Sequence, residues 1–143
     1  MRRRLAGDEG AISAAVPILA LMFLLLAGLV VDSGRQLNAR ARAVSYAEEA
    51  ARAGAQGIDP ASDPLVLDAP VVRDRVVGYC DRVEEAEGAE HVRTCEVRDV
   101  DVVEGVVTVR VELAIPSGLL GLAGVATLRA SGEGTARPVI GVR

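Results

Sequence analysis

The sequence predicts an α+β protein. A single N-terminal transmembrane helix continues as a long helix, and a small domain with one helix on a three-stranded antiparallel sheet follows. Three observations carry this prediction: residues 11–31 hold no charge over 21 positions, residues 35–56 are rich in strong helix formers, and after residue 88 the apolar period falls to two.

The uncharged run 11–31 is long enough to cross a bilayer as one helix, at ~30 Å for this length. It is apolar on all sides, so it lacks the polar, water-facing side that a surface helix of a soluble protein has. A cleaved secretory signal is the alternative, but its apolar region usually covers ~7–15 residues and ends at a small-residue site. We therefore expect a single-pass anchor in contact with the lipid bilayer.

The orientation of this span does not follow from arginine counts, because three arginines lie on each side: Arg2, Arg3 and Arg4 before it, and Arg35, Arg40 and Arg42 after it. The short head 1–10 and the long C-terminal region favour a cytoplasmic N-terminus. Two cysteines in the distal region suit an oxidising compartment. We expect a cell-membrane protein with a cytoplasmic head and an extracytoplasmic C-terminal domain.

The helix is predicted to extend beyond the membrane through residues 32–57, until Gly54, Gly57 and Asp59-Pro60 end it. Small and apolar residues recur along it at three- and four-residue steps: Leu37, Ala41, Val44, Ala47, Ala51 and Ala55. Two interpretations of this stripe remain open. It packs against the chain's own C-terminal unit, or against neighbouring copies or partner helices.

A proline-punctuated loop is expected at 58–69, before the small domain 70–143. Its acids, Asp59, Asp63 and Asp68, lack the spacing and the closing glutamate of a calcium loop, so we expect solvated side chains. Residues 70–87 have helical periodicity, and Gly88 is suited to end that helix.

Strand-like alternation then covers 92–103, 106–115 and 125–135. The apolar parity changes near Arg98-Asp99, which predicts a β-bulge, and Glu104-Gly105 predicts a two-residue hairpin turn.

The connection 117–124 contains Leu119, Leu120 and Leu122, which is unusual for a solvated loop. These leucines either tuck under the sheet or contact the membrane or a partner.

Cys80 lies on the apolar face of the second predicted helix, and Cys95 lies on a strand face that should meet it in the core. A disulfide between them would close a loop of about fifteen residues and contribute ~3 kcal/mol on the chain-entropy model. Two buried free thiols are the alternative.

Composition argues against several classes of function. From Asp32 onward the chain has 13 Arg against 18 acidic residues and no Trp, which does not suit nucleic-acid binding. A lone His91 does not predict a metal site, and Asp99, Asp101 and Glu104 read as a solvated strand edge. No arrangement predicts a catalytic site or a cofactor, so we do not expect an enzyme.

Several segments resemble the TadE/TadG-like family of pilin-like membrane proteins from the Flp (tight-adherence, type IVb) pilus machinery. They are the head ending Asp8-Glu9-Gly10, the span, Val31-Asp32-Ser33-Gly34-Arg35, and AVSYAEEAARAGAQ at 43–56. Residues 118–138 are similar to the end of actinobacterial members.

The resemblance implies a candidate prepilin-peptidase cut between Gly10 and Ala11. Pilin-type substrates carry Glu at the fifth position after the cut, where this chain has Ala15. That departure and the VDSGR segment favour the TadG-like side, whose members often stay uncut in the membrane.

The function implied is that of a pseudopilin-like, membrane-anchored component in assembly of a Tad/Flp-type pilus or related secretion apparatus. It would act by helix–helix association with other pilin-like subunits or pilus-assembly membrane proteins through residues 11–56. Small residues in the span would allow close approach: Ala14, Ala15, Ala20, Ala27 and Gly28. The alternative is a membrane-anchored extracytoplasmic protein-binding module of the cell envelope, which binds through its sheet or through residues 117–124.

Overall fold

The computed structural model describes residues 8–59, 66–88, 91–92 and 94–138. The elements follow the order α1 (Asp8–Ala55), α2 (Ala69–Glu87), β1 (Thr94–Val103), β2 (Val106–Pro116), the 3-10 helix η1 (Leu119–Ala123) and β3 (Thr127–Ala136). The strands form one antiparallel sheet of order β1-β2-β3. The predicted α+β class is confirmed.

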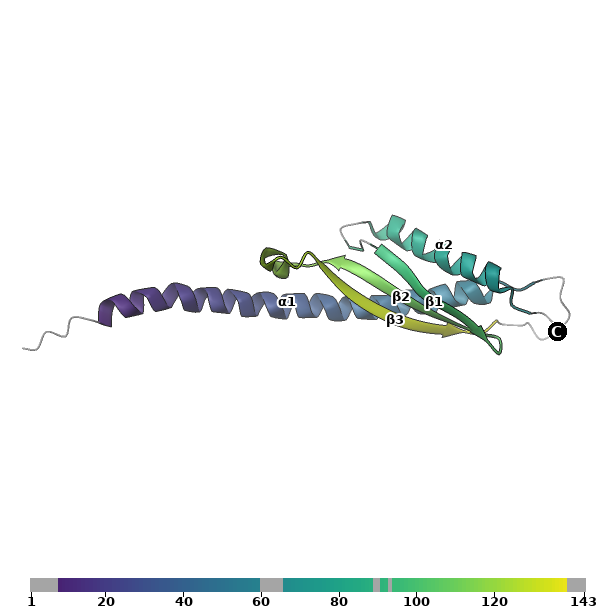
Figure 1. Cartoon of the computed structure of the whole chain (residues 1–143), viewed down its shortest axis with the longest axis horizontal. Coiled ribbons are helices and arrows are strands. Elements are labelled where there is room, and N and C mark those ends of the chain that lie inside the picture. Colours follow the sequence, from purple (N-terminus) through teal and green to yellow (C-terminus); the bar gives the residue numbers. More distant parts are fainter. Residues whose placement is uncertain (1–7, 60–65, 89–90, 93, 139–143) are drawn as a thin grey trace, which may run out of the picture.

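α1 is one unbroken helix of 48 residues, which gives a rod of ~72 Å. Its N-terminal half extends well past the rest of the molecule (Figure 1). Pro17 lies inside it without ending it. The helix stops where the Gly57 N–H donates to the Gly54 carbonyl at 2.8 Å, close to the predicted end. The prediction of a single continuous helix through residue 56 is confirmed to within one residue.

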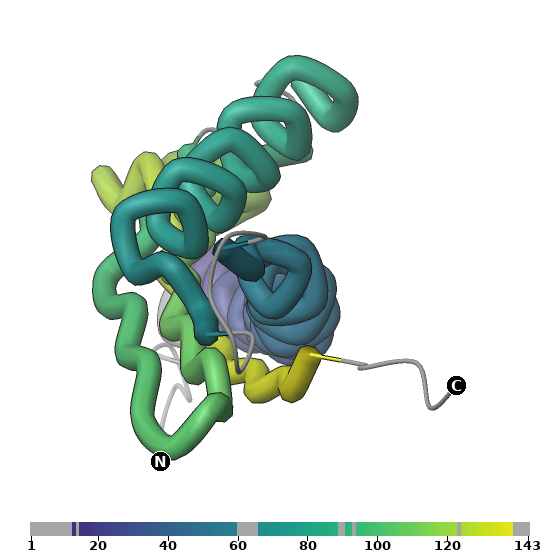
Figure 2. Tube along the Cα trace, turned by 90° about the vertical axis from the view of Figure 1, so that its right-hand side faces the viewer, coloured from purple at the N-terminus to yellow at the C-terminus, as the bar shows by residue number. Residues whose placement is uncertain are grey.

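Two helices share one face of the sheet. The C-terminal half of α1 packs on β2 and β3, while α2 packs on β1 and on α1. The view along α1 shows the strands and α2 on one side of this helix, with its other side open (Figure 2). The sequence predicted one helix on the sheet, and the extension of the apolar helix supplies the second.

The buried stripe of α1 consists of alanines: Ala39, Ala43, Ala47, Ala50, Ala51 and Ala55. It packs on the chain's own sheet, which decides between the two interpretations of the small-residue stripe for this half of the helix. The predicted stripe was partly wrong in register. Ala47, Ala51 and Ala55 are buried, but Leu37 is 70% exposed and Ala41 is exposed. The buried stripe follows four-residue steps from Ala39. The few large apolar residues of this segment lie outside this stripe, so they do not indicate which side of the helix is buried.

Two glycines let β3 lie directly against the backbone of α1. A Cβ at Gly132 would lie less than 3.0 Å from backbone atoms of Ala43 and Val44, and one at Gly134 equally close to Ala47 and Glu48. Real Cβ atoms do not approach that closely, so only glycine fits at either position. Alanine on the helix and glycine on the strand together produce this close contact.

The strand predictions hold in detail. The register shifts between Val97 and Asp99, which places the predicted bulge at Arg98. Glu104 and Gly105 both have positive φ, 51° and 73°, as a two-residue primed hairpin turn requires. The predicted inward face of β2 is buried: Val107, Val109, Val111, Leu113 and Ile115.

A disulfide joins α2 to β1. Cys80 and Cys95 are both buried, and their Cα atoms are 5.3 Å apart, within the usual range for a bridge. The predicted pair is therefore formed, and the alternative of two free thiols does not apply.

The opposite face of the sheet is polar. Glu112 accepts from Arg98 and Arg129 on the neighbouring strands, and Arg110 pairs with Glu133. The hydrogen bonds from Arg98 and Arg129 lower the pKa of Glu112 below its usual value. The predicted solvated edge is exposed as expected, at Asp99, Asp101 and Glu104.

In the segment expected as a solvated loop, Asp63 lies outside the described residues. Asp59 and Asp68 are half-buried, and Asp68 occupies the N-cap position of α2. Both acids are therefore only partly exposed to solvent. The bridge between Ile58 and Leu67 brings the two ends of the segment together.

Candidate functional site

The segment between β2 and β3 reaches along α1 toward its apolar half. We call residues 118–124, which include η1, the leucine tip. Figure 1 shows it beyond the end of the sheet, beside α1. It comes close to α1 at Gly28, where an added Cβ would lie 3.0 Å from the Leu119 Cβ. Gly28 is therefore one place where the tip meets the helix.

Asp32 holds the leucine tip in place. Its side chain is the one buried charged group among the described residues, with 1% exposure. Oδ1 accepts the Gly118 N–H at 2.8 Å, and Oδ2 accepts the Leu120 N–H at 2.6 Å. Burial of a carboxylate is costly unless it is paired, and hydrogen bonds to a charged acceptor are among the strongest. This contact links residues more than eighty positions apart in the chain.

Gly118 is required by the same contact. A Cβ there would lie 2.6 Å from Asp32 Oδ1 and 3.3 Å from a guanidinium nitrogen of Arg35. The absence of a side chain lets the carboxylate reach two backbone N–H groups at once.

The tip also satisfies much of its own backbone. Gly121 donates to the Gly118 carbonyl, Gly124 to Gly121, and Val125 to Leu120, at 3.0–3.3 Å. Gly124 has a φ of 91°, a left-handed conformation that glycine adopts without strain. The tip is thus a small closed turn.

The three leucines of the tip have different surroundings. Leu120 is half-buried against the cluster of Ala39, Ile115, Leu128 and Ala130. Leu119 is 40% exposed and Leu122 88% exposed. The expectation that the leucines tuck under the sheet therefore holds only for Leu120.

A groove of about 430 Å³ separates the tip from α1. Its lining is almost wholly leucine: Leu21, Leu24, Leu25 and Leu29 with Gly28 from α1, and Leu119, Leu120 and Leu122 from the tip. The tip thus lies beside the part of α1 that is long and apolar enough to cross a membrane.

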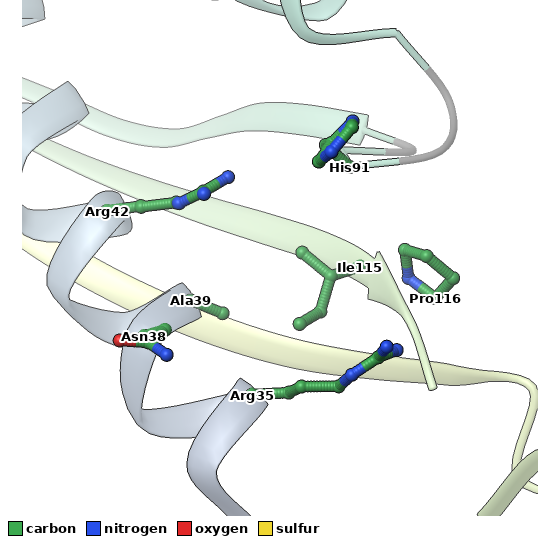
Figure 3. A pocket seen from close by; sticks show the side chains of 7 residues that line it. All are labelled: Arg35, Asn38, Ala39, Arg42, His91, Ile115 and Pro116. Carbon is green, nitrogen blue, oxygen red and sulfur yellow. The ribbon is translucent and has the colours of Figure 1, made fainter. Parts of the chain in front are cut away.

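A second hollow, of about 300 Å³, lies on the other side of the same end of the domain. Figure 3 shows Arg35 and Arg42 extending from α1 toward Pro116 and His91. His91 is exposed and lies in the turn before β1. Guanidinium groups bind carboxylates and phosphates, and Arg42 already pairs with Glu87 at 3.6 Å.

Glu87 also binds a second side chain of α1, Tyr46. The Tyr46 hydroxyl donates to Glu87 Oε1 at 2.9 Å and so links α1 to the end of α2. Burial, followed by the hydrogen bond and the negative charge of Glu87, raises the pKa of Tyr46 to about 12. The phenol therefore stays protonated, as a donor, at any physiological pH.

Within the part of the chain that the structure describes, no three His, Cys, Asp or Glu side chains gather to hold a metal ion. Gly10 and Ala11, the candidate cleavage site, lie within the backbone of α1. Sequence reasoning missed Asp32 and treated it only as the end of the span. Two features of the sequence could have indicated its role. Asp32 directly follows an uncharged run of 21 residues, and the leucine-rich loop contains a glycine, Gly118, that leaves room for a side chain to reach the loop backbone.

Part of this chain matches a model of a known protein family. Residues 10–57 match the family described as putative Flp pilus-assembly TadE/G-like. The match covers about a third of the chain and nearly all of α1, including the alanine stripe. It supports a role in Flp pilus assembly and makes no distinction between the TadE and TadG sides. The match ends at Gly57, so the resemblance of residues 118–138 to actinobacterial members stays a prediction. No curated protein and no solved structure matches the chain.

Proposed function

We propose that this protein is a pilin-like, membrane-anchored component that acts in assembly of a Tad/Flp-type pilus or a related secretion apparatus. One observation carries the proposal. The family match falls on a single long helix whose N-terminal half is apolar and exposed, in front of a half that carries a folded domain. We propose a structural role in helix–helix association, without enzymatic activity.

The proposed location is the cell membrane, with head 1–10 in the cytoplasm, span 11–31, and residues 32–143 outside. The disulfide between Cys80 and Cys95 supports an oxidising compartment for the domain. The long region after the span is compatible with the same orientation, since such regions are translocated largely regardless of charge.

Two surfaces of α1 are already covered within the chain. The alanine stripe is covered by the chain's own sheet, and Gly28 is covered by Leu119. We therefore propose that association through residues 11–56 uses other surfaces of this helix. Among the alanines predicted for close approach, Ala14 lies outside the described side chains. Ala15, Ala20 and Ala27 are exposed, and Ala20 and Ala27 share a helix face.

Cross-linking in native membranes tests this association. Cysteine is introduced singly at Ala20 or Ala27, with Met22, on the opposite face, as the matched control. The native cysteines are already paired, so they leave the introduced thiol as the reactive group. We expect oxidative cross-links to other copies or other pilin-like subunits from A20C and A27C, but not from M22C. Equal cross-linking at all three positions, or none, would contradict a specific helix interface.

The N-terminus of the protein recovered from native membranes tests its place in the apparatus. We propose Gly10–Ala11 as a candidate site for a prepilin peptidase, with Ala15 in place of glutamate favouring a TadG-like protein that remains uncut. An intact mass that starts at Met1 supports a permanent assembly factor. A start at Ala11 supports a filament or pseudopilus subunit instead.

A further inference from the structure

We propose that the leucine tip is embedded in the acyl layer of the outer leaflet, as a second lipid-contacting element beside the span. The inference rests on the proposed function only in requiring that α1 crosses a bilayer. It adds a contact that neither the family match nor the span itself includes, because the tip comes from residues 118–124 of the distal domain.

The first argument is axial position along α1. The groove between tip and helix is lined from Leu21 to Leu29, whereas the uncharged run ends at Val31. At ~1.5 Å per residue, the α1 residues that line the groove lie ~3–15 Å on the bilayer side of Val31. If the membrane surface were moved to Leu21 to keep the tip in water, residues 11–21 would cover only ~16 Å of a ~30 Å core. A helix that spans the bilayer therefore brings the tip into it.

The second argument is the chemistry of the tip. Leu122 is 88% exposed and Leu119 40%, and both adjoin the exposed leucines of the span. Together these side chains form one continuous apolar surface over two segments of the chain. Acyl chains suit this surface because they cover a groove of any shape, whereas a soluble partner from outside the membrane would have to enter the bilayer to reach it.

The third argument is hydrogen bonding. Backbone groups without partners are costly in hydrocarbon, so a loop enters a bilayer only when they are satisfied by the protein. Gly121 and Gly124 donate to carbonyls within the tip, the adjoining Val125 donates to Leu120, and Asp32 accepts two further N–H groups of the tip. Asp32 is the first residue after the uncharged run. Its carboxylate therefore binds the backbone of the tip at the depth where the surface of the membrane would lie.

Tryptophan fluorescence in brominated lipid tests the proposal. The chain has no native Trp, so a single introduced Trp is an unambiguous reporter. The full chain is reconstituted in phosphatidylcholine–phosphatidylglycerol vesicles with bromine on the acyl chains. Three variants are compared: L122W at the tip, L29W in the span, and V103W at the distal hairpin, where Val103 is 55% exposed. All three positions are exposed, so each variant should retain the fold.

We expect a roughly twofold or larger loss of L122W and L29W emission relative to unbrominated lipid, and little loss for V103W, because quenching requires contact within the acyl layer. Quenching of L29W with L122W no more affected than V103W would overturn the proposal and leave the span intact. An unquenched L122W whose emission shifts with the protein-to-lipid ratio would overturn it in favour of a second copy. Absence of quenching at L29W would reject the span itself, and with it the proposed function.

Discussion

The two halves of α1 are built from different side chains although they form one helix. From Leu21 to Val31 the side chains are large and mostly half or more exposed, whereas the buried residues of the half from Ala39 to Ala55 are alanines. Large side chains suit a fluid solvent of acyl chains, which adapts to any surface. Alanine suits a fixed partner at short distance, here the backbone of β3 at Gly132 and Gly134.

The difference teaches that small residues on a long, partly apolar helix need not mark an interface with other chains. In this protein they mark contact with the chain's own sheet. The comparison also predicts that equal substitutions in the two halves have unequal effects on stability.

The largest effect is expected at the strand glycines. Gly134→Val would place its side chain inside the backbone of α1, and we expect a loss of more than ~3 kcal/mol or failure to fold. Thermal unfolding of the full chain followed by circular dichroism measures it. Thr135→Val, exposed on the same strand, and Ala27→Val, exposed in the apolar half, are the matched controls. Equal destabilisation by Ala27→Val would break the comparison.

The disulfide is expected to matter only for the domain half. Reduction, or replacement of both Cys80 and Cys95 by Ala, should lower the free energy of unfolding by ~3 kcal/mol, because the bridge closes a loop of about fifteen residues in the unfolded chain. Urea unfolding with and without reductant measures this. Helicity of the span should stay unchanged, and a parallel loss there would show that the halves unfold as one unit.

Asp32 lies at the boundary between the halves. Asp32→Ala removes two charge-assisted hydrogen bonds worth ~1.5–3 kcal/mol each, so local opening of the leucine tip should become roughly 100 times more frequent or more. Hydrogen exchange at the Gly118 and Leu120 amides reports that opening. Asp101→Ala, an exposed acid on β1, serves as the control. Unchanged exchange at both amides would remove Asp32 as the anchor of the tip.

The smallest effect is expected at Tyr46. A raised pKa means that folding favours the neutral phenol, so this contribution is complete below the unfolded value near 10 and is lost as the pH rises through about 12. Tyr46→Phe removes the bond to Glu87 at a cost of ~0.5–1 kcal/mol, since the site is only partly buried. Phenolate absorbance against pH measures the pKa. A transition of Tyr46 at 10 in the folded protein would disprove its burial at the α1–α2 contact.

The sequence alone determined several features that rest on a local pattern. An uncharged run, a change of period from helix to strand, a parity change at Arg98-Asp99 and a turn at Glu104-Gly105 each specify geometry through neighbours a few residues away. The sequence also indicated the disulfide, with two buried free thiols as the alternative, because Cys80 and Cys95 lay on faces expected to meet in the core. Each of these features appears in the structure where it was predicted.

Only the tertiary structure decided which line of α1 faces the sheet, where the tip lies, and what Asp32 does. A stripe of alanines has little local signal, because alanine fits either a solvated or a buried face. The identity of its partner depends on Gly132 and Gly134, some ninety residues later in the chain. Likewise, nothing near Asp32 in the sequence shows that its carboxylate meets Gly118 and Leu120. Such contacts depend on how distant segments pack against each other, and the periodicity of a single segment does not determine this packing.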